Sequence, residues 1–303
     1  MMNVSMMLQR FLLTLAFAAA PAGAHAAITV VDDSGARVTV GQPARRVISM
    51  APHITELLFA AGGGDKVVGA MNYSDYPEAA KKIPLVGSSS QLDLERLVAL
   101  KPDLLVVWQS GNTARQLDQL RQLGIPLFYS EPQQLDQVAT SLLRLGQLLG
   151  TERTAQPAAA AFRARVATLR ARYGSPLPVR APVRVFYQIW DKPLYTLNGS
   201  QIVSDAISLC GGENVFAKLS VKAPEVSIEA VIQADPEVIF GGEQHDTADA
   251  GLNIWSPYKS MRAVKRGNLF NLDGELLTRP SPRIVVGAAA MCEKLALARQ
   301  RRR

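Results

Sequence analysis

Cysteine and histidine are both scarce in this chain. Its 303 residues include two cysteines and three histidines, and only His53 and His245 lie beyond residue 26. Two histidines are too few for a metal site unless carboxylates supply most of the ligands, and we expect no bound metal. The motifs Cys-x-x-Cys, Gly-x-x-x-x-Gly-Lys-Ser/Thr, Gly-x-Ser-x-Gly and His-Glu-x-x-His are also missing, and we predict no catalytic residue and no cofactor.

Charged and aromatic residues are also few. Charged residues make up 19% of the chain and aromatic residues 6%, against 48% hydrophobic residues, a balance typical of globular proteins. The net charge is +7, but the chain has no internal run of basic residues with interleaved aromatics, so we do not expect a nucleic-acid partner. Part of the positive charge lies in residues 299–303, a C-terminal tail that we expect to be frayed and solvated.

Long hydrophobic runs are missing as well. The apolar run 11–20 is shorter than the roughly 20 residues that a membrane span needs. Arg10, this run and the small-residue sequence Ala24-His25-Ala26 follow the order of a secretory signal peptide, with cleavage after Ala26. We therefore expect residues 1–26 to be a signal peptide and the mature protein to be soluble and exported.

Beyond residue 26, short apolar segments typical of buried strands alternate with helical patterns. The predicted strands are a hairpin over 28–40 and the segments 46–50, 67–70, 104–108, 126–129 and 183–189. The predicted helices in the first half are 54–61, 93–100, 114–123 and 135–149. This alternation predicts an α/β fold with central parallel sheets.

Residues 152–173 interrupt the alternation. This stretch is rich in alanine and arginine and has apolar residues at helical spacing, so it predicts one long helix. On either side of it, residues 93–107 and 227–240 repeat one plan of a capped helix, a proline turn and a buried strand. We therefore expect two Rossmann-like lobes joined by one long backbone helix.

The same plan gives the expected domain boundaries. Residues 27–150 form the N-terminal lobe, 151–175 the connecting helix and 176–303 the C-terminal lobe. Because a helix resists bending more than a loop does, this connector predicts only small hinge motion. We expect the protein to be a monomer.

Five segments of the chain carry a family resemblance. They are residues 46–62, 73–77, 94–103, 210–214 and 281–284, spread over nearly all of the mature chain. They resemble the vitamin B12-binding members of the helical-backbone class of periplasmic binding proteins. The sequence Glu-Arg-Leu-Val-Ala-Leu-Lys-Pro-Asp is typical of the class, and Tyr-Ser-Asp-Tyr-Pro points to its cobalamin branch. The resemblance implies a location in the periplasm and a ligand cleft between the lobes.

The family's ligand contacts fall on Tyr73, Trp108 and Tyr195, with Arg279 on the far side. A corrin ring is a broad, mostly apolar plate fringed by amides, so aromatic faces bury it and polar tips meet the amides. Trp108 directly follows an apolar strand, and the ends of strands are where ligand sites of α/β sheets open. We expect Arg279 to pair with the nucleotide phosphate or with an amide carbonyl of the ligand.

Some positions of the implied ligand site differ from the family's pattern. Two tryptophans of the family appear here as Ser89 and Ala223, which makes the aromatic cage thinner, and Glu275 replaces another carboxylate near the arginine. His53 follows the first core strand and has two interpretations. It is either a metal ligand that faces the cleft or, as we favour, a loop histidine that is hydrogen-bonded near the start of the next helix.

The resemblance also assigns two acidic residues and the two cysteines. Glu95 and Glu229 match the family's carboxylates that dock onto arginines of a membrane permease dimer, although both also suit the first turn of a helix. A single cysteine pair in an oxidising compartment forms a disulfide or remains as two buried thiols, and we favour the disulfide. The family's paired cysteines fall on Cys210 and Cys292.

We therefore predict the binding component of an ABC importer, which captures cobalamin or a related corrinoid as cargo and delivers it to the inner-membrane permease. One alternative keeps the class but changes the ligand to haem or a ferric siderophore. Another is an exported enzyme with a clustered nucleophile and base. A third is a structural periplasmic protein in which Glu95 and Glu229 serve only as helix caps.

Overall fold

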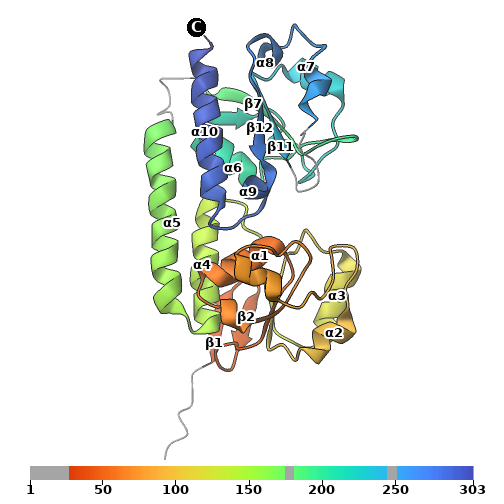
Figure 1. Ribbon diagram of the computed structural model, residues 1–303, viewed down its shortest axis with the longest axis vertical. Helices are drawn as coiled ribbons and strands as arrows, with labels where there is room; N and C mark the ends of the chain where they lie inside the picture. The colour runs from red at the N-terminus through yellow and green to blue at the C-terminus, as the bar shows by residue number, and fades with distance from the viewer. Residues whose placement is uncertain (1–26, 175–180, 244–250, 303) are drawn as a thin grey trace, which may run out of the picture.

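The computed structural model describes residues 27–174, 181–243 and 251–302. The expected signal peptide and His245 lie outside the described residues. Two α/β lobes are stacked along the long axis of the molecule (Figure 1). In the described residues, no helix combines the length and the apolar character that crossing a membrane requires.

The N-terminal lobe is built on a parallel sheet with the strand order β4-β3-β5-β6. Its strands are β3 (Val47–Ser49), β4 (Val67–Ala70), β5 (Leu104–Val107) and β6 (Leu127–Tyr129), and an antiparallel hairpin of β1 (Ile28–Val31) and β2 (Arg37–Val40) precedes them. Its helices are α1 (Pro52–Ala60), α2 (Leu94–Ala99), α3 (Ala114–Gln122) and α4 (Leu135–Leu149), with short 3-10 turns η1 (Gly64–Lys66) and η2 (Glu78–Lys82). The predicted strands and helices of this lobe are confirmed.

Apolar residues fill these strands because both faces of the sheet are covered. Leu104 and Val106 belong to the large core shared with the connecting helix, whereas Leu105 and Val107 belong to a second core on the other face. Alternate residues of a strand point to opposite faces, so a strand that is buried on both faces is apolar throughout. All four of these residues are fully buried.

The C-terminal lobe repeats this architecture with the parallel strand order β10-β7-β11-β12. Its strands are β7 (Val183–Gln188), β10 (Gly212–Asn214), β11 (Val238–Glu243) and β12 (Leu269–Asp273), with an antiparallel hairpin of β8 (Trp190–Asp191) and β9 (Leu194–Tyr195). Its helices are α6 (Ile202–Leu209), α7 (Ile228–Ala234), α8 (Arg262–Lys265), α9 (Gly274–Thr278) and α10 (Ile284–Gln300), with the 3-10 turn η3 (Leu252–Trp255).

One 22-residue helix, α5 (Glu152–Tyr173), runs alongside both lobes (Figure 1). It packs against α4 and α1 of the N-terminal lobe and against α10 and α6 of the C-terminal lobe. Its buried residues, Ala155, Ala159, Phe162 and Val166, recur every three or four positions and so form one stripe. The predicted long helix and the predicted fold class are thus confirmed, whereas the lobe boundaries remain a prediction.

A disulfide and the hydrogen bonds of three arginines attach α10 and the C-terminal residues to the rest of the C-terminal lobe. Cys210 and Cys292 are joined, with a Cα–Cα distance of 4.8 Å, which links the end of α6 to α10. The expectation of a frayed tail is wrong as far as residue 302. Arg299 donates to the Cys210 carbonyl, Arg301 to the Gly267 carbonyl at 2.6 Å, and Arg302 to the Glu237 carboxylate at 2.5 Å. Guanidinium groups near the end of a helix find acceptors that hold the terminus in place.

Candidate functional site

The residues that connect the two lobes follow the carboxyl ends of the sheet strands. In the N-terminal lobe, Glu56 follows β3, Asp75 follows β4 and Glu131 follows β6. In the C-terminal lobe, Arg279 follows β12 and α9. Ligand sites of α/β proteins lie outside the carboxyl ends of strands, so this is where the fold places a site.

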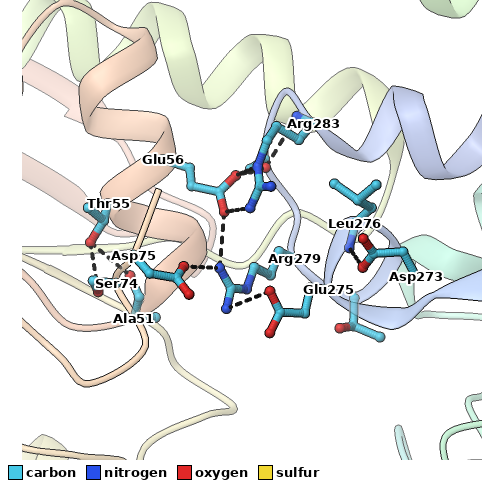
Figure 2. A network of polar contacts seen from close by, with 12 residues as sticks. Ala51, Thr55, Glu56, Ser74, Asp75, Asp273, Glu275, Leu276, Arg279 and Arg283 are labelled. Carbon is cyan, nitrogen blue, oxygen red and sulfur yellow. Dashed lines mark hydrogen bonds and ion pairs between the residues drawn. The ribbon is translucent and has the colours of Figure 1, made fainter. Parts of the chain in front are cut away.

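A cluster of ion pairs joins the lobes around Glu56 (Figure 2). This residue lies in α1, which begins at Pro52 because proline suits the first turn of a helix. The Glu56 side chain is only 2% exposed, and its carboxylate accepts hydrogen bonds from Arg283 at 2.6 and 2.9 Å and from the Ser281 hydroxyl at 2.5 Å. The hydrogen bonds that Arg283 donates to the Glu56 carboxylate raise the pKa of Arg283. A carboxylate so deeply buried depends on these partners to offset its lost hydration.

Arg279 belongs to the same cluster. Its guanidinium lies 2.9 Å from Asp75, 3.3 Å from Glu56 and 3.2 Å from Glu275, as the dashed lines in Figure 2 show. Arg283 also stacks over the Tyr76 ring, with its guanidinium carbon 4.0 Å from the ring centroid. Within the described residues, the cluster thus brings three carboxylates and two guanidinium groups together. The structure confirms that Glu275 lies beside Arg279, but Glu56, Asp75 and Arg283 were missed by sequence reasoning.

A second connection between the lobes lies near Trp108. Lys222 of the C-terminal lobe donates to Glu131 of the N-terminal lobe at 2.8 Å. Ser110 donates to the same carboxylate through its amide at 2.9 Å and through its hydroxyl at 2.6 Å. Burial by itself raises the pKa of Glu131, but the hydrogen bonds from Lys222 and Ser110 outweigh that effect and hold the pKa below its ordinary value. The segment that follows Trp108 therefore faces the segment that contains Lys222 and Ala223.

Trp108 is held in a fixed position after β5. Its carbonyl accepts a hydrogen bond from the Asn112 amide at 2.6 Å, and its ring lies against the backbone of Gly111. A Cβ atom at Gly111 would lie 1.9 Å from Cε3 of the indole, so only glycine allows this approach.

His53 packs edge-on against Trp108, with the ring centroids 5.3 Å apart and the ring planes at 86°. The histidine lies in the first turn of α1 and is only 3% exposed. Burial lowers its pKa to about 4, so the imidazole is neutral at neutral pH. Its Nε2 atom has no hydrogen-bond partner among the described residues. This buried position is closer to the structural interpretation of His53 than to an exposed metal ligand, although the residue lies in a helix rather than a loop.

The remaining residues of the predicted ligand site occupy the loops around these two connections. Tyr73 follows β4 with a φ of 64° and is 60% exposed, and it precedes Asp75 by two positions. Tyr195 ends β9 and is partly buried, whereas Ala223 is exposed beside Lys222. Ser89 is exposed as well, and its carbonyl accepts from the Gln116 amide at 3.2 Å.

Glu95 and Glu229 occupy equivalent positions in the two lobes. Each is the second residue of its helix, α2 or α7, and each is exposed. The cap of α2 is the Asp93 side chain, which accepts from the Arg96 amide at 2.9 Å, and the cap of α7 is Ser227, which accepts from the Ala230 amide at 3.1 Å. Hydrogen bonds from its own amide and from Ser227 lower the pKa of Glu229. Helix capping therefore involves Glu229 in part, but Asp93 serves this purpose at α2.

A hollow of about 450 Å³ lies beside Glu95 on the N-terminal lobe. The residues that line it are Asn72, Gly87, Ser88, Gln91, Leu92, Asp93, Leu94 and Glu95. The hollow therefore extends from the segment next to Tyr73 to the first turn of α2.

Comparison with known proteins gives consistent results. Residues 47–276 match the family of periplasmic binding proteins. The vitamin B12-binding protein of Yersinia pestis (strain Pestoides F) is 42% identical over 255 residues, which cover 84% of this chain and 88% of the relative. The crystal structure of the periplasmic vitamin B12-binding protein of Vibrio cholerae is similar with a TM-score of 0.77 and 38% identity, covering 85% of this chain and 98% of that one. A periplasmic heme-binding protein from Roseiflexus sp. RS-1 is similar with a TM-score of 0.71 and 25% identity, covering 84% and 98%.

Proposed function

Because the chain belongs to the periplasmic binding protein family, we propose that it is the periplasmic component of an ABC importer that captures cobalamin or a related corrinoid between its lobes. The observation that carries this proposal is the 42% identity, over 84% of the chain, to a protein named for binding vitamin B12. The relatives reported above are named for binding, and we propose no catalytic step for this chain.

The charges between the lobes support a corrinoid over haem or a ferric siderophore. Haem carries propionates and many siderophores are anionic, so a site for either needs cations that are available to the ligand. Here Arg279 lies among three carboxylates, and Lys222 is paired with Glu131. A corrinoid, whose rim consists mostly of neutral amides, depends less on cations that are free of these carboxylates.

We propose that Tyr73, Trp108 and Tyr195 supply flat apolar surface to the corrin ring. Burial of such a ring against aromatic faces removes a large apolar area from water. Arg279 and Glu275 form a polar pair, 3.2 Å apart, that can meet amides of the ligand. At Ser89 and Ala223 the ligand meets small side chains, which leaves more room than the family's tryptophans leave.

Capture in this proposal relies on lobes that are already in place. The helix α5 and the ion pairs of Glu56 and Glu131 tie the lobes together, so little order has to be gained when the ligand binds. Glu95 and Glu229 then dock on two similar surfaces of a permease dimer, one for each lobe. Their helices, α2 and α7, both lie on the side of the molecule away from α5 (Figure 1).

Calorimetric titration of the purified mature protein with cyanocobalamin tests the proposal, with haem and a ferric siderophore as controls. We expect a dissociation constant between nanomolar and low micromolar, or about −12 to −8 kcal/mol, for cyanocobalamin alone. Binding of haem or the siderophore without binding of cyanocobalamin would preserve the importer role and reject the corrinoid. Binding of none of the three would reject the proposal as stated.

A further inference from the structure

Two tryptophans of this chain, Trp190 and Trp255, lie outside the proposed ligand site. Trp255 is fully buried and Trp108 is partly buried, but Trp190 is 44% exposed. Tryptophan is a large amphipathic side chain that is enriched where a protein contacts a partner. The position of Trp190 in the hairpin indicates which contact it makes.

Trp190 lies directly opposite Tyr195 in the antiparallel pair of β8 and β9. Residues that face each other in such a pair point their side chains to the same face of the ribbon, with Cβ atoms about 4.5–5.5 Å apart. The side chains of Trp190 and Tyr195 therefore project from the same face of the hairpin.

The orientation of the Trp190 ring is fixed locally. Its Nε1 donates to the Lys192 carbonyl at 2.9 Å, within the same hairpin. This hydrogen bond satisfies the polar edge of the indole, so the exposed part of the ring is apolar. A ring that is already oriented loses little entropy on binding.

The other side of Tyr195 is occupied by the segment that contains Ala223. Tyr195 pairs with Glu225 in an antiparallel bridge, and the Asn198 amide donates to the Lys222 carbonyl at 3.0 Å. Trp190 and this segment thus flank β9 on opposite sides. Because Lys222 reaches Glu131 of the N-terminal lobe, the segment lies at the junction of the two lobes.

We propose that Trp190 is a ligand-contacting residue that supplies aromatic surface beside Tyr195, in place of the surface that Ala223 lacks. The inference rests on the proposed function and identifies a residue that sets the affinity of this chain for a corrinoid. The ligand's broad plate is supported from the C-terminal lobe by two adjacent rings, Trp190 and Tyr195. Aromatic contacts of this kind contribute beyond their buried area.

Calorimetric titration with cyanocobalamin tests this role in the wild type and in the variants Trp190→Ala and Trp190→Phe. The expected result is a roughly tenfold weaker dissociation constant for Trp190→Ala, about 1.4 kcal/mol, and a smaller loss for Trp190→Phe. The matched control is Val31→Ala, which removes another exposed apolar side chain, 51% exposed in β1, and is expected to leave affinity unchanged. Thermal unfolding of each variant shows whether it keeps the fold.

A double variant extends the test. Trp190→Ala combined with Ala223→Trp restores most of the lost affinity if the two positions flank one ligand surface. If the wild type binds cyanocobalamin and folded Trp190→Ala binds it within twofold, the role of Trp190 is overturned while the proposed function stands. If the wild type itself does not bind, the proposed function fails and this inference fails with it.

Discussion

The Glu56 carboxylate of one lobe and the Arg283 guanidinium of the other form two hydrogen bonds, at 2.6 and 2.9 Å, although 227 positions separate them in the chain. Because Glu56 is almost fully buried, the bond network determines whether its charge is tolerated. We expect Glu56→Gln to leave Arg279 and Arg283 with too little negative charge and to lower the free energy of unfolding by about 3 kcal/mol. Urea unfolding monitored by circular dichroism measures this loss.

The control for this variant is Glu78→Gln, which breaks an ion pair with Lys81 whose glutamate side chain is 83% exposed. Exposed pairs contribute little, so we expect a change within about 0.5 kcal/mol. A loss for Glu56→Gln no larger than that of the control would show that the buried cluster gives no net stability.

The buried His53 makes the stability of the folded protein depend on pH. Burial lowers its pKa from 6.5 to about 4, while the charges of Glu131 and Glu56 act in the opposite direction and Arg279 adds to the lowering. Between pH 6.5 and 4 the unfolded chain binds a proton at this residue that the folded chain does not, so stability falls as the pH falls through this range. The expected loss from His53 is about 3 kcal/mol.

Unfolding experiments at several pH values between 7 and 4 test this prediction in the wild type and in His53→Asn. Because the substitution also changes stability at neutral pH, the quantity to compare is the slope of stability with pH. We expect a shallower slope for His53→Asn, and parallel slopes for the two proteins would contradict the prediction.

Gly111 controls the position of Trp108. Gly111→Ala places a Cβ atom 1.9 Å from the indole and must displace the ring. If Trp108 contacts the ligand, affinity for cyanocobalamin falls by about tenfold, or about 1.4 kcal/mol, in calorimetry. Gly41→Ala is the matched control, because a Cβ atom there meets nothing within 4 Å. Equal affinities of the two variants would remove Trp108 from the proposed ligand site.

Glu95 and Glu229 offer a test of docking that leaves ligand capture intact. Glu95→Gln and Glu229→Gln are each expected to weaken binding to the permease by about 1 kcal/mol, or roughly fivefold, and the double variant by more. Uptake of labelled cyanocobalamin by cells that contain the permease measures this effect, and calorimetry checks that ligand affinity is unchanged. Glu213→Gln, another exposed carboxylate in β10, is the control. Normal uptake by the double variant would reject these two residues as docking sites.

The strands and helices of the two lobes are predicted well because each depends on a local pattern of apolar residues. The apolar run 104–107 and the capped helix before it read as a buried strand and a helix without knowledge of the rest of the chain, and both are found. The helix 152–173 is predicted in the same way from the spacing of its apolar residues. The disulfide, which we favoured because the expected exported chain has a single cysteine pair, is present between Cys210 and Cys292.

The contacts between the lobes could not be predicted in this way. The bond from Arg279 to Asp75 joins residues 204 positions apart, and the bond from Lys222 to Glu131 joins residues 91 apart. Such pairs depend on how the lobes are placed. One signal was present at Glu56, the single acidic residue of a mostly apolar helix, since a buried carboxylate requires a partner.

The disulfide also encloses the residues of the C-terminal lobe that form ion pairs with the N-terminal lobe. Cys210 and Cys292 close a covalent ring with a sequence separation of 82, and Lys222, Arg279 and Arg283 all lie inside it. In a chain-entropy description, a ring of this length lowers the conformational entropy of the unfolded chain, which stabilises the folded protein by about 4.5 kcal/mol. The three cations that hold the N-terminal lobe therefore belong to one closed loop. Tyr195 and Trp190 precede that loop in the chain, and the backbone bridge between Tyr195 and Glu225 connects their hairpin to it.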